Sequence, residues 1–296
     1  MSYKPVVAVL GTNGFLGKPI LEALQSPTFS AKYTLPIRAL TRDKSKYEDT
    51  DLVKYYEIVP NDANSIAEAL KGVDVFVNVG GGATDHGLVL EGVLKAGGVK
   101  LYIPSQFGTA LSDASYLPIL QGKVDHSAKA RAEGLKTVDI YTSLFAAPGS
   151  FLYEVIAAIG FDKDSNTATF RGDPAAKFDI SFLPDIGKSV ASLSALEPST
   201  LPDEIRISSD QVTQEEVLAR YEKTHSVKVE RKSISKEDAL KYAKELLSTK
   251  GFDFADFFLY LQTFISQGDD KGLAFTKNDD ELVNPGESLW KWTKFE

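Results

Sequence analysis

Three glycines that follow an apolar run constrain the fold of this chain more than any other feature. Residues Val6–Leu10 are all apolar, and Gly11, Gly14 and Gly17 come directly after them. A continuous apolar run is typical of a parallel strand that is buried on both faces. The residues from there to Leu24 carry apolar side chains at helical spacing. The pattern therefore predicts a strand, a tight glycine turn and a helix.

Strand and helix patterns continue to alternate up to about residue 145. The expected strands are Val6–Leu10, Ile37–Thr41, Tyr55–Val59, Val73–Val79, Leu101–Ile103 and Val138–Phe145. The expected helices are Leu16–Leu24, a short one around Ile66–Leu70, Leu88–Ala96 and Leu117–Glu133. Such alternation predicts an α/β protein with a doubly wound parallel sheet of the Rossmann type. Ligands of these sheets bind at the edge where the strands' carboxyl ends lie.

The glycine loop has the spacing of a dinucleotide-binding turn. Its glycines permit a sharp exit from the strand, close approach of a pyrophosphate and close helix packing. The helix N-terminus adds free N–H groups and a positive dipole end. A strand before and a helix after favour this reading over an ordinary turn. The expected pyrophosphate-binding residues are Gly11, Thr12, Asn13, Gly14, Phe15, Leu16 and Gly17.

The end of the second expected strand predicts which dinucleotide is bound. Proteins that bind NAD carry a carboxylate there, whereas a cation suits the 2′-phosphate of NADP. Here Arg42 follows the strand, with Lys44 and Lys46 close by. Asp43 leaves NAD open, because a shift of one residue would put a carboxylate in place, and a solvated loop of mixed charge is a third interpretation. We expect NADP, with NADPH preferred over NADH, and Arg42 and Lys44 at the phosphate.

After Pro148 the pattern changes to short strands and amphipathic helices. Expected strands are Thr167–Phe170 and Phe178–Phe182, and expected helices are Pro184–Val190, Gln214–Lys223 and Lys236–Leu247. We therefore expect a Rossmann domain over residues 1–150 and a smaller α+β substrate-binding region over residues 151–296. Part of residues 178–200 can return to the first domain. The aromatic segment Phe252–Phe264 suits either a substrate pocket or a core.

Charge and composition restrict the partners of the chain. The net charge of −8 does not favour nucleic acid or an anionic membrane. The absence of cysteine excludes disulfides and thiolate chemistry and fits a reducing compartment. No apolar run approaches the roughly 20 residues that span a bilayer, and the N-terminal run is interpreted as a strand instead of a signal peptide. We expect a cytoplasmic protein with a small-molecule substrate.

Lysine is the candidate catalytic residue type. No tyrosine is followed four residues later by the lysine of common short-chain dehydrogenases; Tyr102, for example, is followed by Gln106. The helix after the fifth expected strand carries Lys123, whose ammonium could stabilise or protonate negative charge that develops during hydride transfer. A surface lysine on a polar helix is the commoner alternative. The three histidines, His86, His126 and His225, have no metal spacing, and no metal is expected.

Several segments, in order, resemble the NmrA-like and isoflavone-reductase-like branch of atypical short-chain dehydrogenases. They are Gly11–Gly17, Leu101–Gly108, Gly122–Lys123, Val138–Ala146, Asp179–Gly187 and Leu282–Pro285. The resemblance implies an NADPH-dependent reductase of aromatic, phenylpropanoid-like substrates. In it, Lys123 matches the catalytic lysine, which also contacts the cofactor, Arg42 matches the 2′-phosphate-binding arginine, and Phe145 lies where a nicotinamide contact is expected.

The loops after the fourth and fifth strands complete the expected site. We expect Gly80 and Ser105 beside the nicotinamide half of the cofactor, and Gln106 in the site where the family often has glutamate. The NmrA-type members imply an alternative function, in which the chain senses NADP(H), binds a protein partner and catalyses nothing.

Overall fold

A five-stranded parallel sheet forms the centre of the first half of the chain in this computed structural model, which describes residues 3–110, 120–147, 156–268 and 273–296. Its order is β3-β2-β1-β4-β5. The strands are β1 (Val7–Leu10), β2 (Ile37–Thr41), β3 (Val53–Glu57), β4 (Val75–Asn78) and β5 (Leu101–Ile103). Since the chain winds outward from β1 in both directions, the predicted doubly wound fold class is confirmed.

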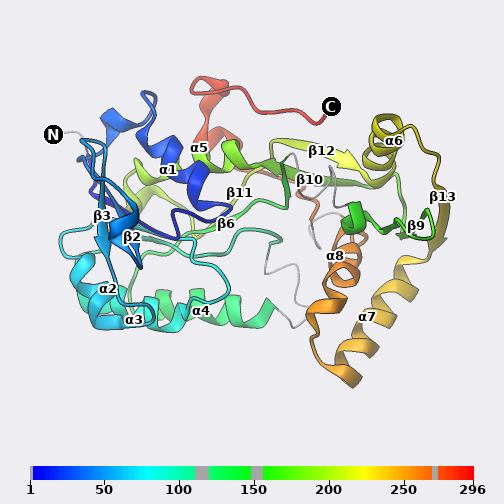
Figure 1. Cartoon of the computed structure of the whole chain (residues 1–296), viewed down its shortest axis with the longest axis horizontal. Helices are drawn as coiled ribbons and strands as arrows, with labels where there is room; N and C mark the ends of the chain where they lie inside the picture. The colour runs from blue at the N-terminus through cyan, green and yellow to red at the C-terminus, as the bar shows by residue number, and fades with distance from the viewer. Residues whose placement is uncertain (1–2, 111–119, 148–155, 269–272) are drawn as a thin grey trace.

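Helices cover both faces of this sheet. On one face lie α1 (Gly17–Gln25) and α5 (Leu183–Ser194), and on the other lie α2 (Ala63–Ala69), α3 (His86–Ala96) and α4 (Gln121–Ala132) (Figure 1). Strand β1 shows how the sequence produces two cores. Val7 and Val9 join the core under α1 and α5, whereas Ala8 and Leu10 join the core under α2 and α3. Alternate residues of a strand face opposite sides, so an all-apolar strand supplies both layers.

The predicted strand Val138–Phe145 is wrong as a single element. It is divided into β6 (Asp139–Tyr141), which pairs with β11 (Glu204–Arg206), and β7 (Leu144–Ala146), which pairs with β10 (Lys177–Phe182). The chain turns between them because Ser143 has a φ of 52° and its N–H, like that of Thr142, donates to the carbonyl oxygen of Gly108. A parallel bridge from Tyr102 to Thr137, two residues before β6, joins this segment to the edge of the central sheet.

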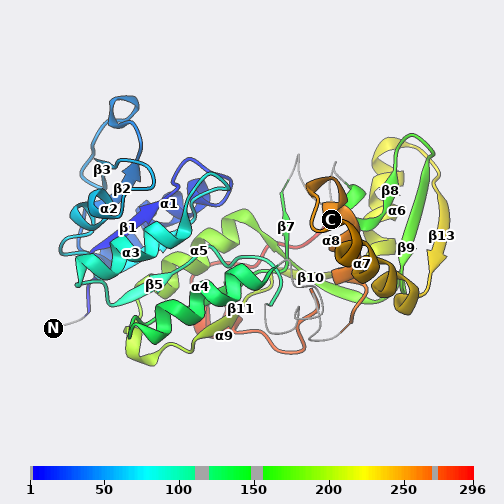
Figure 2. The same ribbon diagram turned by 90° about the horizontal axis from the view of Figure 1, so that it is seen from below.

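The second half of the chain has an apolar core of its own (right side of Figure 2). Besides β7 and β10, residues of β8 (Phe161–Asp162), β9 (Thr167–Arg171), β12 (Asp210–Thr213), α6 (Gln214–His225), α7 (Lys236–Lys250) and α8 (Phe257–Ile265) contribute to this core. Strand β13 (Glu230–Ile234) is exposed and pairs with β9. The domain boundary predicted between residues 150 and 151, Pro148 and the expected helix start at 117–119 lie outside the described residues.

Segments distant in sequence return to the first core. Ile186 and Val190 of α5 pack there, as do Val283, in α9 (Asp280–Val283), and Trp290. The division into two domains at residue 150 remains a prediction. No helix in the four described ranges is long and apolar enough to cross a membrane.

Helices α1 and α5 approach so closely that a glycine is required between them. A Cβ added at Gly187 would lie 2.3 Å from the carbonyl oxygen of Pro19, which is backbone and cannot rotate away. Close contact between these two helices therefore depends on the missing side chain at Gly187.

We expect Gly187→Ala to lower the free energy of unfolding by about 1–3 kcal/mol, because the added methyl group forces the two helices apart. Equilibrium denaturation in guanidinium measures the change. The matched control is Gly122→Ala in α4, where an added Cβ meets no atom within 4 Å. There the substitution should leave stability unchanged or raise it. Equal effects of the two substitutions would contradict this account of the α1–α5 contact.

Candidate active site

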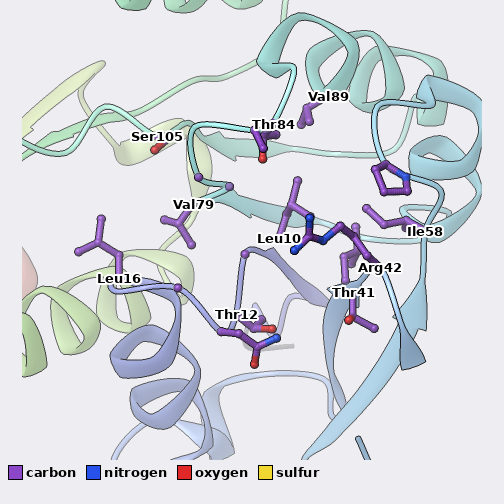
Figure 3. A pocket seen from close by; sticks show the side chains of 18 of the residues that line it. Leu10, Thr12, Leu16, Thr41, Arg42, Ile58, Val79, Thr84, Val89 and Ser105 are labelled. Atoms are coloured by element: carbon purple, nitrogen blue, oxygen red, sulfur yellow. The ribbon is translucent and has the colours of Figure 1, made fainter. Parts of the chain in front are cut away.

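A cleft of about 940 Å³ opens at the carboxyl ends of β1, β2 and β4 (Figure 3). In this view, Arg42 projects into the cavity towards Leu10, and Ser105 lies at the far end. Many of the residues predicted to bind the cofactor line this cleft: Gly11, Thr12, Asn13, Gly14, Phe15, Leu16, Arg42, Gly80, Ser105 and Phe145. The topology thus brings residues from four separate loops, and Phe145 from strand β7 (Leu144–Ala146), to one cavity.

Each glycine of the loop meets a different structural constraint. Gly11 has a φ of 92°, and a Cβ there would lie 2.5 Å from the carbonyl oxygen of Val79. A Cβ at Gly17 would lie 2.0 Å from the carbonyl oxygen of Gly11, so Gly17 allows α1 to begin against the end of β1. Gly17 itself does not line the cleft. At Gly14 a Cβ would come within 3.2 Å of the Gly11 carbonyl oxygen, and Gly14 lines the cavity.

The loop fits a dinucleotide pyrophosphate. In the described part of the chain, the N–H groups of Asn13, Phe15 and Leu16 donate to no other group. Gly81 and Gly82 line the same cleft, and a Cβ added at either would meet no atom within 4 Å. Free N–H groups at a helix N-terminus suit an anion that must approach the backbone.

The charged residues at the rim of the cleft differ in whether they form ion pairs. Arg42 is exposed and has no ion-pair partner within the described ranges. Asp43 accepts hydrogen bonds from Ser45 and forms an ion pair with Lys46 at 3.1 Å, and these contacts hold the pKa of its carboxyl below the usual value. Lys44 pairs with Asp49 at 3.0 Å and does not line the cleft, whereas Lys46 does.

Tyr47 is a cleft residue that the sequence analysis missed. Its ring stacks on Tyr55 with centroids 4.6 Å apart, and its hydroxyl accepts a hydrogen bond from the side-chain amide of Asn13. This contact joins the β2–β3 loop to the glycine loop across the cleft. A tyrosine in a charged loop carries no periodic signal, so only the fold reveals the contact.

A smaller cavity of about 210 Å³ lies beyond Phe145, which lines both cavities. The smaller one is lined mainly by apolar side chains from both halves of the chain, with Lys123 among them. Its aromatic lining residues are Phe107, Phe145, Phe257, Tyr260 and Phe264. The segment Phe252–Phe264 therefore serves both interpretations of the sequence, because Phe257 and Tyr260 line the cavity and Phe264 also belongs to the second core.

The ammonium group of Lys123 lies at the wall of this mainly apolar cavity. Burial lowers its pKa to about 8, against the opposing charge of Asp139. It has no hydrogen-bond or ion-pair partner among the residues that the structure describes. A lysine whose pKa lies near neutrality can both hold and release a proton at physiological pH. The arrangement therefore suits proton transfer at the wall of an apolar pocket.

Gln106 holds the backbone of α4 and does not line either cavity. Its side chain is buried, and Nε2 donates to the carbonyl oxygen of Lys123 and to Oγ of Ser127, both at 2.6 Å. Ser127 in turn donates to Asp139 at 2.7 Å. Both acceptors require an amide N–H at position 106, and a carboxylate would offer them none.

The family model described as NmrA-like matches residues 3–261. The chain belongs to the NmrA-like family. The predicted resemblance is thereby confirmed.

Individual relatives are similar along most of their length. A phenylcoumaran benzylic ether reductase of Pyrus communis is 28% identical over 265 residues, covering 83% of this chain and 82% of the relative. The crystal structure of an isoflavone reductase superposes with a TM-score of 0.71 at 21% identity, covering 96% of this chain and 95% of that one. A leucoanthocyanidin reductase–NADPH complex from Vitis vinifera has a TM-score of 0.66 at 18% identity, covering 95% and 94% of the two chains.

We expect Gln106→Glu to lower the free energy of unfolding by about 1–3 kcal/mol, because the Lys123 carbonyl oxygen then faces a second acceptor. The defect should shrink as the pH falls, since a protonated glutamate regains one donor. Chemical denaturation at two pH values measures both effects. Gln121→Glu is the matched control, because Gln121 is exposed and its side chain donates to Asp125, with no other partner in the described ranges. Equal effects at both positions would overturn the assignment for Gln106.

Proposed function

We propose that the protein is an NADPH-dependent reductase of a small aromatic or conjugated substrate. The observation that carries the proposal is the position of Phe145, which lines both the dinucleotide cleft and the apolar cavity that Lys123 faces. A cofactor with its pyrophosphate on the glycine loop can extend past Ser105 to Phe145. Its reactive end would then meet a substrate in the smaller cavity, next to a lysine that can supply a proton.

The lining of the smaller cavity supports an aromatic substrate. Apolar and aromatic walls favour a flat, apolar ligand, and few polar groups are present to orient it. The relatives named as reductases of phenylcoumaran benzylic ethers, isoflavones and leucoanthocyanidins support reduction as the reaction class.

Lys123 would supply the proton that the reduction needs. The reduced cofactor, when bound, supplies a hydride to one atom of a polarised bond of the substrate. The other atom then gains negative charge, which Lys123 stabilises as an ammonium and neutralises by donating its proton. Solvent returns the proton to the lysine after product leaves. Phe145 and the apolar walls exclude water, which strengthens the interaction between the ammonium and the developing charge.

The rim of the cleft supports NADP over NAD. A 2′-phosphate would meet Arg42, whose guanidinium has no ion-pair partner in the described residues. Asp43, the residue that left NAD open, is already engaged by Ser45 and Lys46, which compete with ribose hydroxyls for its carboxylate oxygens. The Vitis vinifera neighbour, whose structure is a complex with NADPH, is consistent with this choice.

We expect Arg42→Ala to weaken NADPH binding by about 10- to 100-fold, the equivalent of losing a charge-assisted hydrogen bond. NADH binding should change by less than about 3-fold, because NADH lacks the 2′-phosphate. Isothermal titration calorimetry with both cofactors measures the difference. Lys44→Ala is the control, since Lys44 pairs with Asp49 outside the cleft. Equal loss of both cofactors in Arg42→Ala would contradict the assignment.

We expect Lys123→Ala to reduce kcat with aromatic enones and NADPH by about 10²- to 10⁴-fold, the usual contribution of general acid catalysis. In the wild-type protein kcat should fall as the pH rises through about 8, because the protonated lysine is the active form. Lys129→Ala, an exposed position on the same helix, should retain activity. Tight NADPH binding without turnover of any substrate would instead favour the sensing function.

A further inference from the structure

A series of buried and partly buried polar side chains connects the dinucleotide cleft to the helix that carries Lys123. Asn78 at the end of β4 accepts a hydrogen bond from the N–H of Gly80 at 3.1 Å. Its Nδ2 lies 3.0 Å from Nδ1 of His86 and 3.1 Å from the hydroxyl of Tyr102. The Tyr102 hydroxyl lies 2.9 Å from Nε2 of His126. Asn78 and Tyr102 are both fully buried.

The direction of each hydrogen bond in this series follows from the orientation of the Asn78 amide. Because the oxygen of Asn78 accepts from Gly80, its Nδ2 must be the group that faces His86 and Tyr102. Nδ2 therefore donates to both, and Tyr102 donates its own proton to His126. Both histidines act as acceptors and are neutral. Burial lowers the pKa of both rings, that of His126 to about 4, which agrees with this direction.

The series of hydrogen bonds ends at His126, one helical turn from Lys123. His126 follows Lys123 by three residues on α4, and residues at this spacing lie on neighbouring positions of one helix face. Gln106 holds the carbonyl oxygen of Lys123 itself. The turn of α4 that carries the lysine is thus held at two points, by Gln106 and by Tyr102. Tyr102 belongs to β5, and Gln106 belongs to the loop that follows it.

We propose, on the basis of the reductase function above, that Tyr102 and His126 are positioning residues that hold Lys123 against the cofactor. Asn78 completes the unit, because the same side chain fixes the backbone N–H of Gly80 in the cofactor cleft. The unit therefore holds two parts of the structure at once. It fixes Gly80 relative to β4, and it fixes α4 relative to β5. Neither Tyr102 nor His126 lines either of the two cavities.

Removing the contact should expose Lys123 to water. The charged and titratable groups around the lysine are His86 of α3, His126 of α4 and Asp139 of β6, and Tyr260 of α8 shares its cavity. With both histidines neutral, burial is the main effect that lowers the pKa of Lys123. If α4 moves away from β5, water reaches the ammonium, and the pKa of Lys123 rises towards its ordinary value.

The test is Tyr102→Phe, which removes one hydroxyl and keeps the ring that stacks on Phe76. The pKa of Lys123 is measured from the pH dependence of its acetylation by acetic anhydride, followed by peptide mass spectrometry. This readout needs no turnover, so it tests the proposal even if the reductase function fails. We expect the pKa to rise above the wild-type value of about 8. With an active substrate, kcat should fall about 10-fold while the Kd of NADPH changes little.

Two further variants test the contact from the side of α4. His126→Leu removes the acceptor and should raise the pKa of Lys123 as Tyr102→Phe does. The double variant should show no further rise beyond Tyr102→Phe, because the hydrogen bond between Tyr102 and His126 is already lost in either single variant. His126→Gln restores an acceptor oxygen and should recover most of the wild-type pKa and kcat.

Tyr33→Phe is the control for loss of a buried hydroxyl. Tyr33 is buried on the opposite face of the sheet, where its hydroxyl donates to the carbonyl oxygen of Ala191 in α5. It should lose a similar amount of stability without changing the pKa of Lys123. A pKa that stays at the wild-type value in both Tyr102→Phe and His126→Leu would overturn the proposal. So would an equal rise in Tyr33→Phe.

Discussion

The first turn of α1 lies so close to the end of β1 that no side chain fits between them. Gly17 lies against the carbonyl oxygen of Gly11, and Gly11 lies against that of Val79. This contact fixes where α1 begins, and N–H groups of the loop at the cleft donate to no group in the part of the chain that the structure describes. The positive end of the helix and the free donors coincide there. The expected cofactor site depends on this packing of backbone against backbone.

The elements that could be predicted from the sequence are those whose pattern lies within a short run of consecutive residues. Apolar runs such as Val6–Leu10 predicted the strands of the sheet because a doubly covered strand has no polar face. The glycine triad predicted the loop because its turn requires a φ that glycine adopts. Arg42 and Phe145 entered the predictions through chain order and resemblance, and both line the cleft. Their roles in binding remain predictions.

Features that the sequence could not predict depend on contacts between distant residues. The break at Ser143 follows from two N–H groups that donate to Gly108, a contact that no periodic pattern encodes. Gln106 follows the fifth strand, as a cleft residue would, but its amide donates into α4. His86 and His126 are far apart in sequence, yet their ring centroids lie 6.2 Å apart. Only the packing of α3 and α4 on one sheet face brings them together.

The two cavities meet at Phe145, and that junction is the basis of the proposed chemistry. A crystal structure of the protein grown with NADPH tests it most directly. The account predicts the pyrophosphate at the N–H groups of the glycine loop, the 2′-phosphate at Arg42, and the nicotinamide beside Phe145 on the side that faces Lys123. A dinucleotide bound elsewhere, or a nicotinamide directed away from the smaller cavity, would contradict it.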